Sequence, residues 1–531
     1  MSLKRDMGRG SLLLSGIGAI IGSGWLFGAE RAAALAGPAA TLAWVIGTLI
    51  VLTIAAVAVE LGTLFPVAGG MVRFAQATHG PLVGFIAAWA NWISIVTVIP
   101  IEAEASIQYM SSWPYPWARG LFQNEQLTPP ALGMASVLLV MYFLLNYWGV
   151  KVFARSNNLI TVFKIAVPAM TGVALLLTAH HVSNLTGGTG GFFVCGGSSV
   201  LTAVATSGII LSFTGFQSPL NLAGEVRRPD RAIPFAILGS VLITAAIYLL
   251  LQIAFLGALS PVMVARGWSR ISFSSPFAQL AILLNLNWLA IALYVDAFVS
   301  PSGAGIADMA TTSRMLYGME RNGVAPAILG RIDPRSGAPR GALWVNLGVC
   351  FVFLYFFRSW GTLAGAISVA GVISFLMVPI SALALRRTAP QLHRPWRLPA
   401  MSVMARLAFV CSAEMLYWAR WPLTGEVILV FVGALPIYVW YRRRLSIRAL
   451  VPELKAAIWL VLFLPIIALI SWCGSVEFGG QGWVAYGWDI LLVAAVALGF
   501  CEWGLHSAYG SPATDELSIS DAPELVAAGP A

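Results

Sequence analysis

Glycine-rich stretches in two apolar segments are the positions where this sequence is best suited to bind a small charged molecule. The first stretch, residues 16–28, is GIGAIIGSGWLFG and contains five glycines in thirteen residues. Each glycine costs a helix interior up to about 1 kcal/mol relative to alanine, so the helix is expected to break at Gly22-Ser23-Gly24. The helix that restarts after Gly24 would present unpaired N–H groups and the positive end of its dipole, which suits an anionic group.

The second stretch contains Ser207-Gly208 and then Ser212–Pro219, SFTGFQSP. Carbonyl groups freed near Phe213 and Thr214 could accept hydrogen bonds from a cation. A site that offers free amides and free carbonyls together fits a zwitterion, which is the physical case for an α-amino acid. The alternative is that these glycines only allow helices to pack closely, as small residues do in many membrane proteins. Because two segments are interrupted in this way, we favour a binding site over close packing alone.

Lys164 is the most informative charged residue, because it lies about seven residues inside an apolar segment. At 1.5 Å per residue it would lie roughly 10 Å from the segment's end. A charged lysine in a membrane span costs at least about 2.5–3.5 kcal/mol unless it has a partner. Burial disfavours the charged ammonium, so such a lysine could exchange a proton. The residues alone leave a second interpretation open, in which the long side chain reaches the lipid headgroups.

Several carboxylates also fall within apolar segments: Glu60, Glu102, Glu104, Asp296 and Glu414. Each could relay protons, contact a substrate amine or accept structural hydrogen bonds. Because Glu102 and Glu104 are two residues apart, they are expected on different faces of a helix and do not form an acid–base pair. Glu102, Glu104 and Asp296 are the candidate relay residues.

The composition shows what must position these residues. Of 531 residues, 59% are hydrophobic and only 10% are charged, against about 25% charged in soluble proteins. This excludes an ordinary soluble enzyme. A bilayer core needs roughly 20 apolar residues per helix, and the sequence predicts fourteen spans: 11–36, 40–65, 80–112, 130–150, 157–179, 199–224, 232–259, 277–318, 341–358, 361–386, 405–420, 424–441, 455–474 and 484–507.

The net charge is +9, but the basic residues interrupt apolar runs and are not gathered in one basic, nucleic-acid-binding domain. With a cytoplasmic N-terminus, 24 of the 31 Lys and Arg residues fall in cytoplasmic segments, six fall outside, and Lys164 lies within a span. This bias follows the positive-inside rule. It predicts that both termini lie in the cytoplasm. The protein itself is expected in the cytoplasmic membrane.

Interrupted helices in spans one and six indicate two repeats of five helices. Since five is odd, the second repeat must be inverted relative to the first, and substrate is expected where the broken helices meet. The predicted fold is therefore an all-α polytopic membrane protein with a 5+5 inverted-repeat core. We divide the chain into an N-terminus (1–10), the core of helices 1–10 (11–386), helices 11–12 (387–445), helices 13–14 (446–508) and a disordered cytoplasmic tail (509–531).

Three motifs resemble the amino acid–polyamine–organocation (APC) transporter superfamily. They are GIGAIIGSGWLF (residues 16–27), SFTGFQ with AGEVRRPDRAIP (212–217 and 223–234), and TSRMLY with RNGVAP (312–317 and 321–326). The resemblance covers about residues 8–440, and among its subgroups the chain is most similar to the aspartate–proton-symporter-like permeases. Departures from the usual pattern are Gln217 for Glu, Leu211 for an aromatic gate, and Gly224-Glu225 for an acidic pair, so Phe213 or Phe216 could supply the gate.

The resemblance implies roles for individual residues. Substrate would be held by the first broken helix and by the segment from Phe213, which together give Ile20, Gly22, Ser23, Gly24, Phe213, Thr214, Gly215, Phe216 and Gln217. Some proton-coupled members carry a lysine in span five, at the contact of spans one and eight, where sodium-coupled relatives bind the ion. This favours Lys164 as the proton-coupling group, with Ser300 and Ser302 as its neighbours.

These observations predict a secondary active transporter that moves an α-amino acid by proton symport with alternating access. The partners are the amino acid, H⁺ and membrane lipid. No metal or cofactor is predicted, because the sequence lacks metal-like spacing and a P-loop. An amino-acid exchanger is the alternative within the class, and a channel or a membrane-embedded transferase is the rival outside it. The side chain of the substrate and the oligomeric state stay open.

Overall fold

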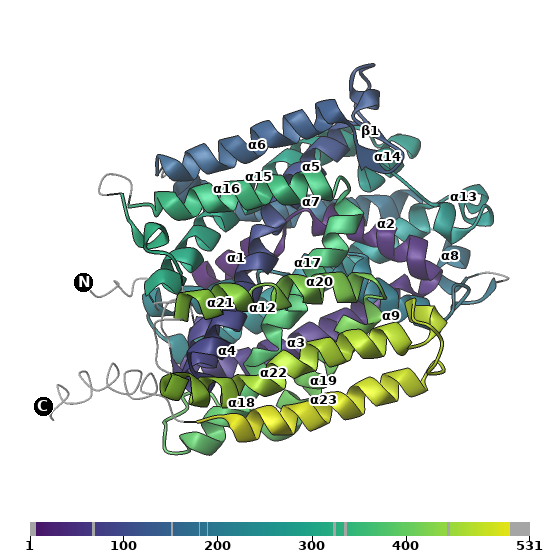
Figure 1. The fold of residues 1–531 in the computed structure, drawn as a ribbon. Coiled ribbons are helices and arrows are strands. Elements are labelled where there is room, and N and C mark those ends of the chain that lie inside the picture. The colour runs from purple at the N-terminus through teal and green to yellow at the C-terminus, as the bar shows by residue number, and fades with distance from the viewer. Residues whose placement is uncertain are drawn as a thin grey trace, which may run out of the picture.

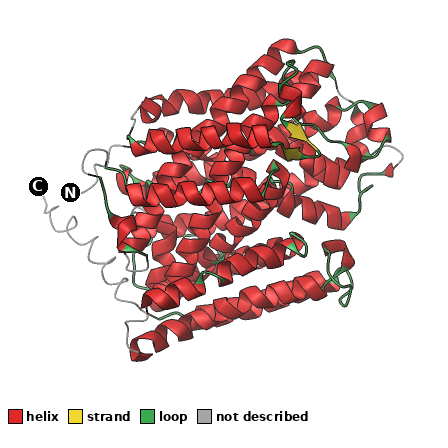
Figure 2. Cartoon of the chain, turned by 45° about the horizontal axis from the view of Figure 1, so that its top comes forward, coloured by secondary structure: helices red, strands yellow, loops and turns green. Residues whose placement is uncertain are grey.

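The structure is a computed structural model that describes residues 7–65, 70–149, 152–179, 181–187, 190–321, 325–333, 337–442 and 447–509. Its helices lie roughly along one direction in a single bundle, with a two-stranded hairpin at one end (Figures 1 and 2). The hairpin pairs β1 (Phe122–Gln123) with β2 (Gln126–Leu127). The predicted tail lies outside the described residues except for Tyr509.

Helices or groups of helices coincide with each of the fourteen predicted spans. In order they are α1 (Arg9–Ile20) with α2 (Gly24–Ala36), α3 (Ala40–Leu64), α4 (Gly70–Val96) with α5 (Val98–Met110), α6 (Pro129–Tyr147), α7 (Val152–Thr178), α9 (Gly197–Thr206) with α10 (Ile209–Phe213) and α11 (Ser218–Asn221), α12 (Pro229–Ala258), α15 (Asn287–Arg321), α16 (Arg340–Phe356), α17 (Trp360–Phe375) with α18 (Met377–Thr388), α19 (Met401–Trp418), α20 (Leu423–Val432) with α21 (Leu435–Arg442), α22 (Ile447–Cys473) and α23 (Trp488–Ser507). Short helices α8 (Val182–Thr186), α13 (Pro261–Ala265) and α14 (Pro276–Leu283) lie in connections.

Ten helices of the described chain are long and apolar enough to cross a membrane, or eleven if the bent pair Gly197–Thr206 and Ile209–Asn221 is one span. This number is smaller than fourteen partly because α1 and α16 are short apolar helices, and because α2 and α3 are joined at Gly37 into one continuous stretch. The outward surface is apolar: the side chains of Leu177 and Phe356 are each 80% exposed. The chain is an all-α polytopic membrane protein.

The starts of the third and eighth predicted spans differ most from the structure. The third span was expected from residue 80, but α4 begins at Gly70 and bends at Gly80, where φ is +81° and Pro81 follows. The eighth was expected from residue 277, but α14 is a separate short helix and α15 begins at Asn287. In both places apolar residues continue through a bend or connection, so hydropathy alone does not reveal where the helix changes.

Spans one and six run in opposite directions. Met7, just before α1, forms a bridge with Val226, which follows the sixth span, and the Arg227 N–H donates to the Met7 carbonyl at 3.2 Å. At the other end of the first span, α2 packs against α9 and α10. The antiparallel arrangement of these two broken spans, five apart in sequence, is the arrangement that an inverted repeat requires.

The last two helices are docked on the core rather than separate from it. Helix α22 packs against α4, and α23 packs against α19 and α22. His79 of α4 connects to α23 through its Nε2, which lies 2.9 Å from the Gly504 carbonyl oxygen. Helices α22 and α23 therefore brace α4 from outside.

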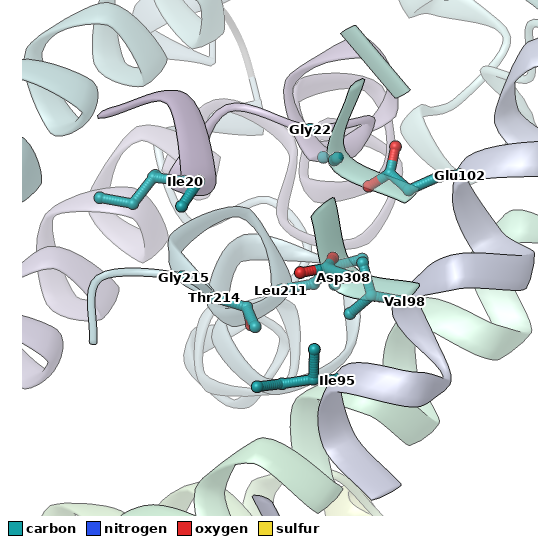
Figure 3. Close-up of a pocket in the computed structure, with 12 residues that line it drawn as sticks. Ile20, Gly22, Ile95, Val98, Glu102, Leu211, Thr214, Gly215 and Asp308 are labelled. Atoms are coloured by element: carbon teal, nitrogen blue, oxygen red, sulfur yellow. The ribbon is translucent and has the colours of Figure 1, made fainter. Parts of the chain in front are cut away.

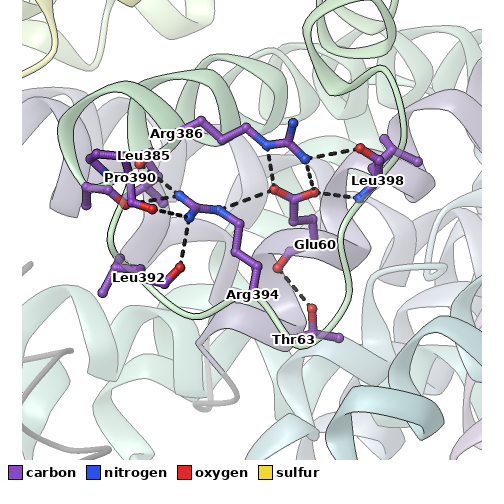
Figure 4. A network of polar contacts seen from close by, with 9 residues as sticks. Glu60, Thr63, Leu385, Arg386, Pro390, Leu392, Arg394 and Leu398 are labelled. Carbon is purple, nitrogen blue, oxygen red and sulfur yellow. Dashed lines mark hydrogen bonds and ion pairs between the residues drawn. The ribbon is translucent and has the colours of Figure 1, made fainter.

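A buried ion-pair cluster ties α3 to the end of α18 and the loop after it (Figure 4). The Glu60 carboxylate accepts from Arg386 Nε at 2.9 Å, Arg386 Nη2 at 2.7 Å and the Leu398 N–H at 2.7 Å. Arg394 Nε lies 3.6 Å from Glu60 Oε1. Of the roles open to Glu60 from sequence, these contacts favour structural acceptor.

Replacing Glu60 by alanine should lower stability markedly, because two arginines would lose their buried partner. Removing one partner of a buried ion pair costs about 3–5 kcal/mol. We expect a clear fall in the thermal unfolding midpoint of the purified protein in detergent. The control is Glu502→Ala, whose more exposed pair with Arg406 should contribute at most about 1 kcal/mol. An equal effect of the two substitutions would contradict this account of the cluster.

Candidate functional site

The first span breaks where the glycine triplet predicts. Helix α1 ends at Ile20, Ile21 is extended (φ −80°, ψ 95°), and α2 begins at Gly24. The Gly22 N–H donates to the Ile20 carbonyl at 3.1 Å rather than four residues back. The Gly18 carbonyl therefore loses the partner that a continuous helix would give it.

The sixth span breaks at two places. Gly208 (φ +90°) separates α9 from α10 with a bend of 46°, and Gly215 (φ +107°) separates α10 from α11. These positive φ values favour glycine.

The two broken spans approach so closely that only glycine fits between them. A Cβ on Gly24 would lie 2.9 Å from the Cα of Ser212, and one on Gly215 would lie 2.4 Å from the Ala19 carbonyl oxygen. Tyr248 of α12 fastens the pair, since its hydroxyl donates to Ser212 O at 3.0 Å and lies 3.4 Å from Ile20 O.

A small cavity of about 30 Å³ lies at this junction (Figure 3). It is lined by residues of both broken spans and of α4, α5 and α15: Ala19, Ile20, Gly22, Gly24, Ile95, Val98, Glu102, Leu211, Thr214, Gly215, Ala304 and Asp308. This is space for only one or two water molecules. In Figure 3, Glu102 lies next to Gly22, and Asp308 lies between Val98 and Thr214.

The carboxylate of Glu102 is bound to the break itself. The Ser23 N–H donates to its Oε1 at 3.1 Å and its Oε2 at 2.9 Å, and the side chain is buried. An N–H group at the start of a helix has no partner within the helix, so Glu102 supplies one from α5. The carboxylate also lies near the positive end of the α2 dipole, which favours its charge.

A second cavity of about 170 Å³ adjoins the first and shares Ala19, Ile95, Gly215, Ala304 and Asp308 with it. It extends along α1 toward Ser15 and includes Lys164. The Lys164 ammonium donates to the freed Gly18 carbonyl at 3.1 Å. It also interacts electrostatically with Glu102, Asp296 and Asp308. The lysine therefore points into the bundle, not to a lipid headgroup.

The other predicted coupling residues lie in two hydrogen-bonded pairs. The Ser300 hydroxyl donates to Asp296 Oδ1 at 2.7 Å, and the Ser302 hydroxyl lies 3.0 Å from the Tyr142 hydroxyl. Within the described chain, the Lys164 ammonium is hydrogen-bonded to Gly18, not to either serine. Glu104 is buried on another face of α5, and neither of its carboxylate oxygens has a hydrogen-bond partner among the described residues.

The predicted substrate residues are placed in different surroundings. Ile20, Gly22, Gly24, Thr214 and Gly215 line the small cavity, and Gln217 lines the second. The Ser23 hydroxyl instead accepts from Trp360 Nε1 at 2.9 Å.

The two phenylalanines line neither of these cavities. Phe213 packs against Trp44 and Tyr248, and Phe216 packs against Phe375. The chain turns at Thr214-Gly215, which presents the backbone to the cavity and sends both rings into the core. The expected aromatic gate is thus not formed by Phe213 or Phe216 in this structure.

Aromatic side chains cover the other side of the break. Trp360 at the start of α17 stacks on Phe27 with ring centroids 4.8 Å apart, and Phe27 meets Tyr109 edge-on at 5.3 Å. Beyond them a cavity of about 930 Å³, lined by Arg31, Arg358 and other residues, lies at the opposite end of the bundle from Ser15. The cavity that holds Lys164 and the large one are thus on opposite sides of an aromatic plug.

Asp308 and Trp360 are the residues that sequence reasoning missed. Asp308 lies inside the predicted span 277–318, so its charge was a usable signal. Trp360 comes just before the predicted span 361–386, at the interface where tryptophan is common in membrane proteins. Only the fold shows that it reaches Ser23.

Comparisons with known proteins show the family of the chain. Residues 8–441 match the amino acid permease family. The glutamate/serine transporter AimA of Bacillus subtilis is 53% identical over 510 residues, which cover 96% of this chain and 94% of that protein. The aspartate-proton symporter of the same organism is 34% identical over 525 residues, covering 97% and 98%.

A more distant relative, the branched-chain amino acid permease BcaP of Bacillus subtilis, is 25% identical over 456 residues, covering 84% of this chain and 94% of that protein. These relatives are transporters and permeases, not enzymes, which removes the transferase alternative. The match, the two broken helices and the apolar bundle lead to one conclusion: the chain belongs to the amino acid permease family of the APC superfamily and is an integral membrane protein of the transporter class.

Proposed function

We propose that this protein imports an α-amino acid across the cytoplasmic membrane by proton symport with alternating access. The observation that carries the proposal is the Lys164 ammonium bound 3.1 Å from the Gly18 carbonyl, at the break of the first span. A titratable group there links protonation to the geometry of the helix that lines the cavity. One of the relatives is named as a proton symporter, which supports the same coupling.

Coupling would follow from the two forms of Lys164. The ammonium donates a hydrogen bond and a charge to the α1 carbonyl, and it is balanced electrostatically by Glu102, Asp296 and Asp308. Loss of the proton would remove the charge and leave three carboxyl groups without a cation. The first span would then prefer a different position, and this preference is how a proton gradient could drive a movement of helices.

The substrate would lie at the junction of the two broken spans. Its carboxylate would bind the N–H groups at the start of α2, and its ammonium would face the carboxylate of Asp308 or the carbonyls near Thr214. The names of the relatives make glutamate, serine and aspartate the first compounds to test. The only cation at the two inner cavities, among the described residues, is Lys164.

The plug formed by Phe27, Tyr109 and Trp360 supports alternating access, because it closes one side of the junction while the Lys164 cavity extends along the other. The positive-inside bias favours a cytoplasmic position for the face at which α1 begins. The arrangement would then be a cytoplasm-facing, nearly closed state. Amino-acid exchange would use the same site and differs from symport in needing a counter-substrate.

Purified protein in liposomes should accumulate one or more of these amino acids when the medium is more acidic than the lumen. Lys164→Ala should lose this gradient-driven accumulation by about tenfold or more, since a hydrogen bond to a charged group contributes about 1.5–3 kcal/mol. Radiolabelled uptake with and without an imposed pH gradient measures the effect.

Lys455→Ala is the matched control, because that lysine is exposed. Uptake that ignores the gradient in the unmodified protein would exclude symport. Uptake that requires amino acid inside the vesicles would indicate an exchanger. A Lys164→Ala variant that still responds fully to pH would remove Lys164 from the coupling role.

Adding a methyl group where the broken spans meet should block transport. Gly24→Ala forces a Cβ against Ser212, and such overpacking costs about 1–3 kcal/mol. We expect uptake to fall about tenfold or more, with the protein still monodisperse in gel filtration. Gly133→Ala, with open space around its Cα, should transport normally. Normal uptake by Gly24→Ala would show that this close approach is not required.

A further inference from the structure

We propose that the Glu102 side chain occupies the place of the substrate carboxylate and must be displaced when substrate binds. This inference rests on the proposed function, because it concerns the same junction of broken spans. It goes further, because Glu102 would compete with the substrate carboxylate for the same backbone N–H groups. Glu102 would then be neither a proton relay nor a partner of the substrate amine.

The contacts of Glu102 are those expected of a bound carboxylate ligand. Both of its oxygens lie within 3.1 Å of the Ser23 nitrogen, at the start of α2. Its Oε1 lies only 2.5 Å from where a Cβ on Gly22 would stand. The glycine thus leaves room for a carboxylate to reach the backbone, and in this structure that carboxylate belongs to the protein.

Space excludes two carboxylates at this position. The cavity beside Glu102 has room for only one or two water molecules, and both Glu102 oxygens already accept from the Ser23 N–H. Two anions on the same donors would also repel each other strongly. A substrate carboxylate can therefore bind the α2 amides only if the Glu102 side chain moves away.

The charges around Glu102 connect this exchange to the coupling site. Lys164 of α7 and Asp308 of α15 interact electrostatically with Glu102, and Lys164 interacts with Asp296 as well. When Glu102 leaves Ser23, the field at the Lys164 ammonium changes. In the absence of substrate, Glu102 satisfies the broken backbone and keeps the site closed.

A competitor lowers apparent affinity by the fraction of time that it holds the site. Neutral or shorter replacements should therefore bind substrate more tightly than the natural residue. Glu102→Gln keeps the shape but removes the charge, and Glu102→Asp keeps the charge but is one methylene too short to reach Ser23. For both we expect the dissociation constant to fall about threefold or more.

The measurement is equilibrium binding of radiolabelled L-glutamate, L-serine and L-aspartate to the purified full-length protein in detergent. Glu477→Gln, an exposed carboxylate in the loop before α23, is the matched control and should bind like the unmodified protein. Tighter binding by Glu102→Gln and Glu102→Asp supports the proposal. Unchanged or weaker binding by both overturns it, and weaker binding would instead favour contact with the substrate amine.

The unmodified protein gives a second readout that does not depend on folding of a variant. Substrate labelled with ¹³C at its carboxylate should perturb an unlabelled protein carboxylate band in the infrared difference spectrum. No perturbation overturns the proposal. If the unmodified protein binds these amino acids but the Glu102 results fail, the transport function stands and only the competitor role is lost. If it binds none of them, both fail.

Discussion

A backbone break inside a membrane must be satisfied by the protein, because lipid offers no hydrogen bonds. The first span of this chain meets that constraint with two side chains of opposite charge. Lys164 donates to the Gly18 carbonyl before the break, and Glu102 accepts from the Ser23 N–H after it. The two charges also interact with each other. The geometry of the site therefore depends on two buried side chains of opposite charge.

The rest of the fold makes this break possible. Gly24 and Gly215 let the two broken spans interlock, and Tyr248 hydrogen-bonds both of them. Phe27 and Trp360 cover one side, while the Lys164 cavity extends along the other. Away from the site, the Glu60 cluster and the outer helices α22 and α23 brace the scaffold. The pair of broken spans is thus held against a braced scaffold.

Much of this architecture follows from the sequence in physical terms. Hydropathy locates the spans because a bilayer demands about 20 apolar residues, and glycine clusters locate the breaks because glycine weakens helices. Lys164 is conspicuous because so few charges lie within spans. The prediction that Glu102 and Glu104 face different ways is confirmed by the structure.

Other features depend on contacts between distant segments. The sequence does not reveal that Phe213 and Phe216 turn into the core, since that requires the direction of the chain after α10. Nor does it show that Trp360 reaches Ser23 across 337 positions, or that Ser300 pairs with Asp296. Residue type indicates that a carboxylate lies within the membrane, and only packing decides whether it braces a scaffold, as Glu60 does, or holds a break, as Glu102 does.

We propose that the charges at the break connect proton movement to amino-acid movement. The most direct test of this coupling uses liposomes that contain the purified protein, with no pH gradient imposed. A pH-sensitive dye inside the liposomes records proton influx. Adding external substrate should acidify the lumen with the unmodified protein and should not with Lys164→Ala, although that variant still binds substrate. Amino acid that enters the liposomes without any acidification would contradict the account.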